Sequence, residues 1–180
     1  MTGADAPGLT DRLTRHIRDV PDYPKPGIVF KDITPLLGDP DAFAATVDAL
    51  AEPFKGIGID KVAGLEARGF ILAAPVALRL GAGFVPIRKE GKLPSATHAV
   101  SFALEYGEAT IEVHRDAFEV GERVLIVDDV LATGGTAAAA VELVGRCGAT
   151  VAGLVVLMEL EFLHGRDRLP GVDLRTLLVA

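Results

Sequence analysis

Residues 124–136 place two adjacent acids and a turn of small residues directly after an apolar run. The acids are Asp128 and Asp129, and the turn comprises Ala132, Thr133, Gly134, Gly135 and Thr136. Consecutive backbone N–H groups of such a turn can surround a phosphate, because glycine allows close approach and the following helix N-terminus favours negative charge. The two acids would repel that phosphate, so we expect them to bind a hydroxyl-bearing group beside it, such as a ribose diol.

Three other structures contain parts of this pattern. Response regulators also have an apolar run that ends in two acids, but theirs lies near the N-terminus and lacks the Thr-Gly-Gly-Thr turn. A Walker A loop requires Gly-Lys-Ser/Thr, and this turn has no such lysine. A strand, turn and helix without a ligand would not need two adjacent acids at the strand end. The complete pattern favours a phosphate site at the carboxyl end of a strand, where ligands bind in open α/β sheets.

Two further segments carry groups that suit phosphates. In residues 64–70, Ala67 and Arg68 lie between an apolar run and a helix start, which makes a second anion site, although an arginine there is more often solvated. Residues 88–97 have little periodicity and are predicted to form a mobile loop with three cations, Arg88, Lys89 and Lys92. Alone they would be a solvated charge run, but beside two phosphate sites we interpret them as a lid that meets pyrophosphate as the site closes.

The hydrophobic pattern predicts the elements that position these groups. Apolar spacing indicates a helix over residues 9–20, which the prolines from Pro21 onward stop. Beyond it the pattern predicts strands over 61–65, 84–87, 123–127 and 151–158, helices over 39–54, 68–80 and 135–146, and a hairpin of 99–106 with 109–114. Strands that alternate with helices imply an α/β fold with a mostly parallel, twisted sheet flanked by helices.

Composition and charge limit the class of protein. The 180 residues fit one domain, and a net charge of −7 argues against nucleic-acid binding through a basic surface. The lone Cys147 cannot form an intrachain disulfide, and no Cys/His spacing resembles a zinc site. The polar N-terminus lacks the apolar core of a secretion signal, and the apolar windows are too short to cross a membrane. We therefore expect a cytoplasmic protein with no membrane partner.

The pattern of residues 124–136 resembles the signature with which phosphoribosyltransferases bind 5-phosphoribosyl-1-pyrophosphate. The resemblance implies the type I fold of that family, with Asp128 and Asp129 on the ribose hydroxyls and residues 132–136 around the 5'-phosphate. It also implies that Ala67 and Arg68 bind the diphosphate, which the cations of residues 88–92 would meet. Mg²⁺ is expected as the cofactor, held mainly by the substrate, because no dedicated protein cage for it is evident.

Two more segments are similar to the adenine branch of this family. Residues 104–107 resemble a loop that closes over the active site, which implies that Glu105 and Tyr106 reach the reacting base. We hypothesise that Glu105 manages a purine proton. Residues 23–35 resemble the hood segment that covers the purine, which implies base contacts from Val29, Phe30 and Lys31.

The chain departs from the family pattern at three positions. Phe102 stands where tyrosine is usual, Lys31 where arginine is frequent, and Ala73 where glycine is frequent. None of them belongs to the two phosphate-binding turns. At Lys31 a guanidinium contact with the base would be lost, whereas a backbone contact would survive. For Phe30 the alternative to a base contact is a simple core residue.

The resemblance implies a homodimeric transferase that converts adenine and 5-phosphoribosyl-1-pyrophosphate to AMP and pyrophosphate. We expect a single domain over residues 1–180, with an N-terminal hood to about residue 35 and a core from about residue 36. An oxopurine phosphoribosyltransferase is one alternative, but it needs a donor for the purine 6-oxygen where Glu159 stands. The other is a non-catalytic regulator that senses 5-phosphoribosyl-1-pyrophosphate, for whose usual DNA-binding domain the chain has no room.

Overall fold

Two sheets organise the chain in the computed structural model, which describes residues 8–103 and 107–180. The contacts divide the chain into two units, Met1–Ala49 and Leu50–Ala180. The smaller sheet belongs to the first unit and the larger one to the second. The predicted hood to about residue 35 and core from about residue 36 stay predictions.

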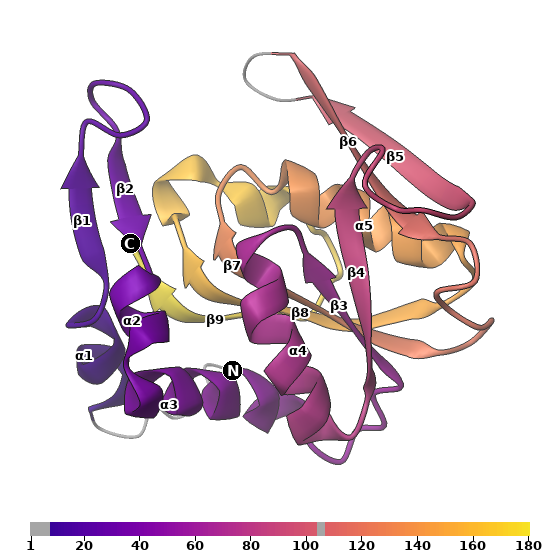
Figure 1. Cartoon of the computed structure of the whole chain (residues 1–180), viewed down its shortest axis with the longest axis horizontal. Coiled ribbons are helices and arrows are strands. Elements are labelled where there is room, and N and C mark those ends of the chain that lie inside the picture. The colour runs from indigo at the N-terminus through magenta and orange to yellow at the C-terminus, as the bar shows by residue number, and fades with distance from the viewer. Residues whose placement is uncertain (1–7, 104–106) are drawn as a thin grey trace. The chain divides into compact units, whose positions relative to one another are not determined.

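The larger sheet has seven strands in the order β5-β6-β4-β3-β7-β8-β9 within the described residues (Figure 1). Its members are β3 (Lys61–Leu65), β4 (Gly83–Lys89), β5 (Thr97–Ala103), β6 (Glu108–His114), β7 (Arg123–Leu131), β8 (Thr150–Glu159) and β9 (Leu174–Val179). The five strands from β4 to β9 across the middle of this order are parallel, and β5 and β6 form an antiparallel edge. The predicted mostly parallel sheet is confirmed.

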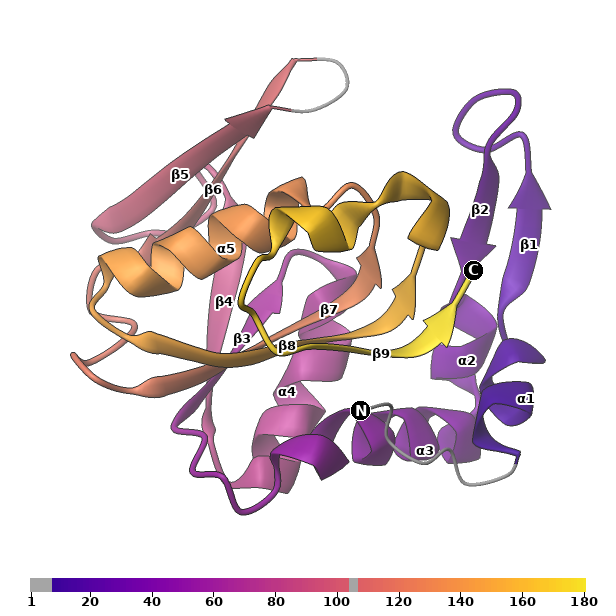
Figure 2. The same ribbon diagram turned by 180° about the vertical axis from the view of Figure 1, so that it is seen from behind.

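Two long helices cover opposite faces of this sheet, as the two views in Figures 1 and 2 show. Helix α4 (Arg68–Leu80) joins β3 to β4, and α5 (Gly135–Arg146) joins β7 to β8. The buried positions of α4, which include Leu72 and Val76, recur at helical spacing. Three short 3-10 helices complete the unit: η1 (Glu52–Phe54), η2 (Glu161–Leu163) and η3 (Gly165–Arg168).

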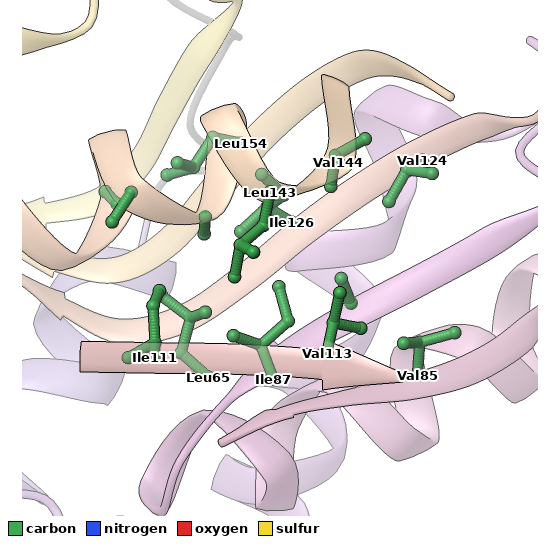
Figure 3. Packing of buried hydrophobic residues seen from close by; sticks show 14 of the residues in the cluster. Leu65, Val85, Ile87, Ile111, Val113, Val124, Ile126, Leu143, Val144 and Leu154 are labelled. Atoms are coloured by element: carbon green, nitrogen blue, oxygen red, sulfur yellow. The ribbon is translucent and has the colours of Figure 1, made fainter. Parts of the chain in front are cut away.

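The core between α5 and the sheet consists mainly of aliphatic side chains, many of them branched (Figure 3). Leu143 and Val144 of α5 and Ile126 of β7 are fully buried there. Burial on both faces explains why β7 and β8 begin as almost continuous apolar runs. No helix in the described residues is long and apolar enough to cross a membrane.

The first unit contains α1 (Leu9–Thr14), β1 (Arg18–Pro21), β2 (Val29–Asp32), α2 (Thr34–Gly38) and most of α3 (Pro40–Ala51). The prediction of one helix over residues 9–20 is wrong beyond Thr14, because Arg18–Pro21 pairs antiparallel with Val29–Asp32. This pairing gives the backbone of β1 the hydrogen bonds that a helix would otherwise supply, and β-branched Val20 suits a strand.

Two boundaries and one additional strand in the second unit also differ from the sequence-based prediction. Strand β7 continues through Asp128 and Asp129 to Leu131, since β8 supplies backbone partners as far as Glu159. Arg88 and Lys89 belong to β4, where they pair with β6, and not to a loop. Strand β9 was not predicted, because its exposed and half-buried pattern does not stand out from a loop in the sequence.

The core predicts the effect of one truncation. We expect Ile126→Ala to lower the free energy of unfolding by about 3 kcal/mol, because it leaves a cavity against α5 that rigid neighbours fill only in part. Val120 is 88% exposed, so Val120→Ala should change stability by less than about 0.5 kcal/mol. Urea denaturation followed by circular dichroism measures both, and equal losses in the two variants would contradict this packing.

Candidate functional site

The direction of the strand connections changes between β3 and β7. These strands are parallel neighbours, but the chain leaves β3 for β4 on one side and β7 for β8 on the other. A crevice opens at such a switch point, outside the carboxyl ends of the two strands, because the two connecting helices lie on opposite faces. The two turns that the sequence analysis selected, residues 64–70 and 132–136, follow these two strand ends.

The turn of residues 132–136 lines a cavity of about 80 Å³ together with Asp128 and Leu65. Gly134 has φ +79°, a conformation that side-chain-bearing residues rarely adopt. Helix α5 begins at Gly135 without a side-chain cap, so no side chain occupies its first N–H groups. The cavity therefore has the backbone geometry and the helix end that suit a phosphate.

Asp128 and Asp129 lie side by side at the end of β7. Asp129 is buried, with 6% of its surface exposed, and its N–H donates to Asp128 Oδ1 at 2.9 Å. Burial, followed by the charge of Asp129, raises the pKa of Asp128 well above its usual range. Two neighbouring carboxylates that are this unfavourable to ionise seldom occur in a protein unless a ligand or partner stabilises their charge.

Arg68 links the first turn to the end of β7. Its Nε lies 2.6 Å from Asp129 Oδ2, so the positive charge at the start of α4 offsets part of the negative charge at the end of β7. A Cβ on Gly69 would lie only 2.7 Å from Asp128 Oδ1, so glycine is required for this approach of α4 to β7. The sequence analysis assigned Arg68 to an anion but gave no role to Gly69.

Glu66 holds the cations of β4 beside the first turn. Its carboxylate accepts hydrogen bonds from Arg88 Nε at 3.2 Å and from the Lys89 N–H at 2.9 Å. Burial acts to raise the pKa of Glu66, but these bonds and the Arg88 charge lower it overall. Glu66 was not predicted as a site residue, although it lies within residues 64–70.

Glu112 of β6 holds the following turn. Its Oε1 accepts from the backbone N–H groups of Lys92 and Leu93, both at 3.1 Å, and the residue is buried. Arg88 also donates to the Lys92 carbonyl at 3.2 Å. Lys89 and Lys92 remain exposed, so this arrangement fixes the backbone while both ammonium groups face solvent.

A second cavity of about 500 Å³ lies between the end of β3 and the β5–β6 hairpin. Glu66, Lys89, Phe102, Thr110 and Thr136 are among its lining residues, so it adjoins both turns. The Phe102 ring lies against Gly135, where a Cβ would be 3.0 Å from the ring. The aromatic ring that the sequence marks as a departure therefore packs on the start of α5.

Val29, Phe30 and Lys31, which are assigned to the base, belong to the first unit. In the first unit, Phe30 makes an edge contact with Tyr23, with ring centroids 5.2 Å apart, and Lys31 Nζ lies 2.8 Å from Asp19 Oδ1. Val29 is exposed at the start of β2. Phe30 is half-buried and is not a fully buried core residue. Glu105 and Tyr106 lie outside the described residues.

The described residues contain no group of three or more His, Cys, Asp or Glu side chains that could hold a metal ion. Glu159, at the end of β8, is buried and forms an ion pair with Arg166. Its carboxylate is therefore already paired and is no donor for a purine oxygen.

Three comparisons with known proteins agree. Residues 40–170 match the family model described as phosphoribosyl transferase domain. Over 165 residues, which are 92% of this chain and 94% of the relative, the chain is 66% identical to adenine phosphoribosyltransferase of Thermobifida fusca. The crystal structure of adenine phosphoribosyltransferase from Rhodothermus marinus has a TM-score of 0.92 at 54% identity, covering 96% of this chain and 98% of that one.

The yeast structure adds ligands to the comparison. Adenine phosphoribosyltransferase from Saccharomyces cerevisiae, complexed with an imino-altritol bisphosphate and adenine, has a TM-score of 0.88 at 39% identity. The match covers 93% of this chain and 97% of the yeast chain.

The raised pKa of Asp128 predicts a pH dependence of stability. An acid whose pKa is raised by folding binds its proton more tightly in the folded state, so the free energy of unfolding falls as pH rises from about 4 to the raised pKa. Asp128→Asn removes this penalty, so we expect the substrate-free variant to be more stable than the parent at pH 7. The gain should shrink below about pH 4, where the parent is protonated too.

Urea denaturation at several pH values measures this difference. The matched control is Asp116→Asn, because Asp116 is exposed on the same unit. A loss of stability in Asp128→Asn that does not change with pH would contradict the assignment of a carboxylate that is costly to ionise.

Proposed function

The chain belongs to the adenine phosphoribosyltransferases, a branch of the phosphoribosyl transferase family, and we propose that it converts adenine and 5-phosphoribosyl-1-pyrophosphate to AMP and pyrophosphate in purine salvage. One observation carries this proposal: two turns suited to anions lie at the adjacent ends of β3 and β7, with two acids beside them. A substrate with a phosphate, a diol and a diphosphate in sequence fits this order of groups.

We assign each part of the substrate to one part of the site. Residues 132–136 bind the 5'-phosphate through backbone N–H groups and the hydroxyls of Thr133 and Thr136. Asp128 and Asp129 accept hydrogen bonds from the ribose hydroxyls. Ala67 and Arg68 of the first turn bind the diphosphate, and the ion pair of Arg68 with Asp129 supports a site in which ribose and diphosphate are neighbours.

The basic groups after this turn complete the diphosphate site. Glu66 and Glu112 hold the backbone of Lys89 and Lys92, so both lysines leave this part of the site from fixed positions. Arg88 is already bonded to Glu66, so its contribution is to the local field.

The reaction breaks the bond between C1' and the pyrophosphate, whose oxygen keeps the electron pair. Positive charge develops on the ribose until the purine nitrogen forms its bond to C1' and releases its proton. The protein contributes by positioning the reactants and by stabilising charge. The acids at the end of β7 lie near the developing cation, and Arg68 with the exposed lysines neutralises the departing pyrophosphate.

We propose Mg²⁺ as the cofactor, held mainly by the diphosphate and the ribose hydroxyls of the substrate. The carboxylate oxygens of Asp128 and Asp129 are hard donors of the kind that Mg²⁺ prefers, and Asp128 lines the cavity beside the turn. When bound, Mg²⁺ would neutralise charge on the leaving pyrophosphate. Within the protein, Asp128 and Asp129 would orient the ribose hydroxyls on which this arrangement depends.

For the base we propose Val29, Phe30 and Lys31. Phe30 offers a stacking face, and strand β2 has a partner on one edge only within its two-stranded sheet. An extended backbone presents alternating C=O and N–H groups, which match the amine donor and ring-nitrogen acceptor of adenine. An oxopurine reverses this pattern and leaves polar groups unpaired, at a cost of about 1–3 kcal/mol for each group. The homodimer and the cytoplasmic location stay predictions.

The direct test offers four bases separately with Mg²⁺ and 5-phosphoribosyl-1-pyrophosphate and follows nucleotides by chromatography. We expect AMP from adenine and at least about 100-fold lower rates with hypoxanthine, guanine and xanthine, since the mismatched edge leaves polar groups unpaired. Product from an oxopurine instead would keep the phosphate sites and contradict the base assignment. Binding of the phosphoribosyl donor without turnover of any base would indicate the non-catalytic regulator.

Glu105 provides a second test. If it manages a purine proton, Glu105→Gln should lower kcat by about 100-fold or more while the KM for 5-phosphoribosyl-1-pyrophosphate changes little. The matched control is Glu119→Gln, because Glu119 is exposed and lines neither cavity; it should keep kcat within about twofold if the effect is specific to the assigned acid. Full turnover of a correctly folded Glu105→Gln protein would exclude the proposed role.

A further inference from the structure

The short helix η3 packs against the turn of residues 132–136. Figures 1 and 2 both show the segment between β8 and β9 beside the connection from β7 to α5. The contact is between backbones: a Cβ on Gly165 would overlap the carbonyl oxygen of Ala132 and lie 2.9 Å from the amide nitrogen of Gly134. In return, a Cβ on Gly134 would overlap the carbonyl oxygen of Gly165.

Arg166 fixes η3 in this place. Its guanidinium forms a double hydrogen bond with the carboxylate of Glu159, with Nε to Oε1 at 3.0 Å, and donates to the Leu174 carbonyl of β9 at 3.1 Å. Glu159 is only 6% exposed, and it is the backbone partner of Leu131, the last residue of β7. The strand ends before and after η3 therefore hold the segment against the turn.

We infer that Gly165 and Arg166 are positioning residues for the 5'-phosphate site: Gly165 supports the turn of residues 132–136 in its phosphate-binding conformation, and Arg166 holds Gly165 in place. The inference rests on the proposed function, in which this turn binds the 5'-phosphate. Neither residue touches the substrate in this account. They act through the turn, whose amide groups must point into the cavity together.

Gly165 affects the turn through steric contact. With a methyl group at residue 165, either η3 or the turn must move, because Cβ atoms do not approach backbone atoms so closely. The pair of Arg166 with Glu159 resists movement of η3, whereas the turn contains a glycine pair and no side-chain cap. The turn therefore yields, and a displacement on the order of 1 Å at a binding site costs up to about 100-fold.

Steady-state kinetics with each substrate varied in turn tests this inference. Gly165→Ala should raise the KM for 5-phosphoribosyl-1-pyrophosphate by about tenfold or more and leave the KM for adenine within about twofold. Gly145→Ala is the matched control, because the same substitution in α5 meets open space. It should leave both KM values unchanged.

A second variant covers the case in which Gly165→Ala does not fold. Arg166→Lys keeps the positive charge beside Glu159 but loses the double hydrogen bond, so the KM for 5-phosphoribosyl-1-pyrophosphate should rise by about threefold to tenfold. In the double variant the loosened η3 relieves the clash, so the effect of Gly165→Ala should be smaller than in the parent.

Binding of ribose 5-phosphate by calorimetry separates the two proposals. If the parent protein makes no AMP, the proposed function fails, and the affinity for ribose 5-phosphate still tests the positioning role. If the parent is active and Gly165→Ala has unchanged KM values and unchanged ribose 5-phosphate affinity, the positioning role is overturned. Equal increases in both KM values would also overturn it, since a loss of general stability would then explain the effect.

Discussion

Two adjacent carboxylates at the end of a buried strand set the main constraint on this structure. Asp128 and Asp129 end an apolar run, and burial raises the pKa of Asp128. Arg68 compensates part of this charge from the start of α4, and the approach that brings it there requires glycine at residue 69. The unfavourable ionisation of Asp128 beside Asp129 lowers stability, which the rest of the sheet must offset. A ligand that donates two hydrogen bonds to these carboxylates would explain why both are present.

Several contacts around the site hold backbone segments in fixed positions. Glu66 and Glu112 each accept backbone N–H groups from the chain that carries Lys89 and Lys92, and Gly165 lies on the backbone of the turn after β7. Anion binding by backbone amides depends on the direction in which the N–H groups point. That direction is fixed by residues that pack against the backbone, and not by side chains that touch the substrate. The supporting carboxylates and glycines are therefore as necessary to such a site as the residues that contact the substrate.

The parts of this site that are formed by residues close together in the sequence could be predicted from it. The apolar runs of β3, β7 and β8 are each continuous in the sequence, and the turns follow two of them directly. Their order along the chain was therefore enough to predict that the turns lie at the carboxyl ends of parallel strands. Glu66, Glu112 and Gly165 were not identified, because their roles come from contacts with residues 19 to 33 positions away, which no local pattern encodes. The end of the first predicted helix was wrong for a related reason: residues 18–21 gain a strand partner that lies beyond a turn.

A crystal structure of the protein with AMP tests the central claim most directly. The account predicts the 5'-phosphate within about 2.7–3.2 Å of the backbone nitrogens of residues 132–136, and the ribose hydroxyls within hydrogen-bonding distance of Asp128 and Asp129. A phosphate bound away from this turn, or a ribose whose hydroxyls face solvent, would contradict it.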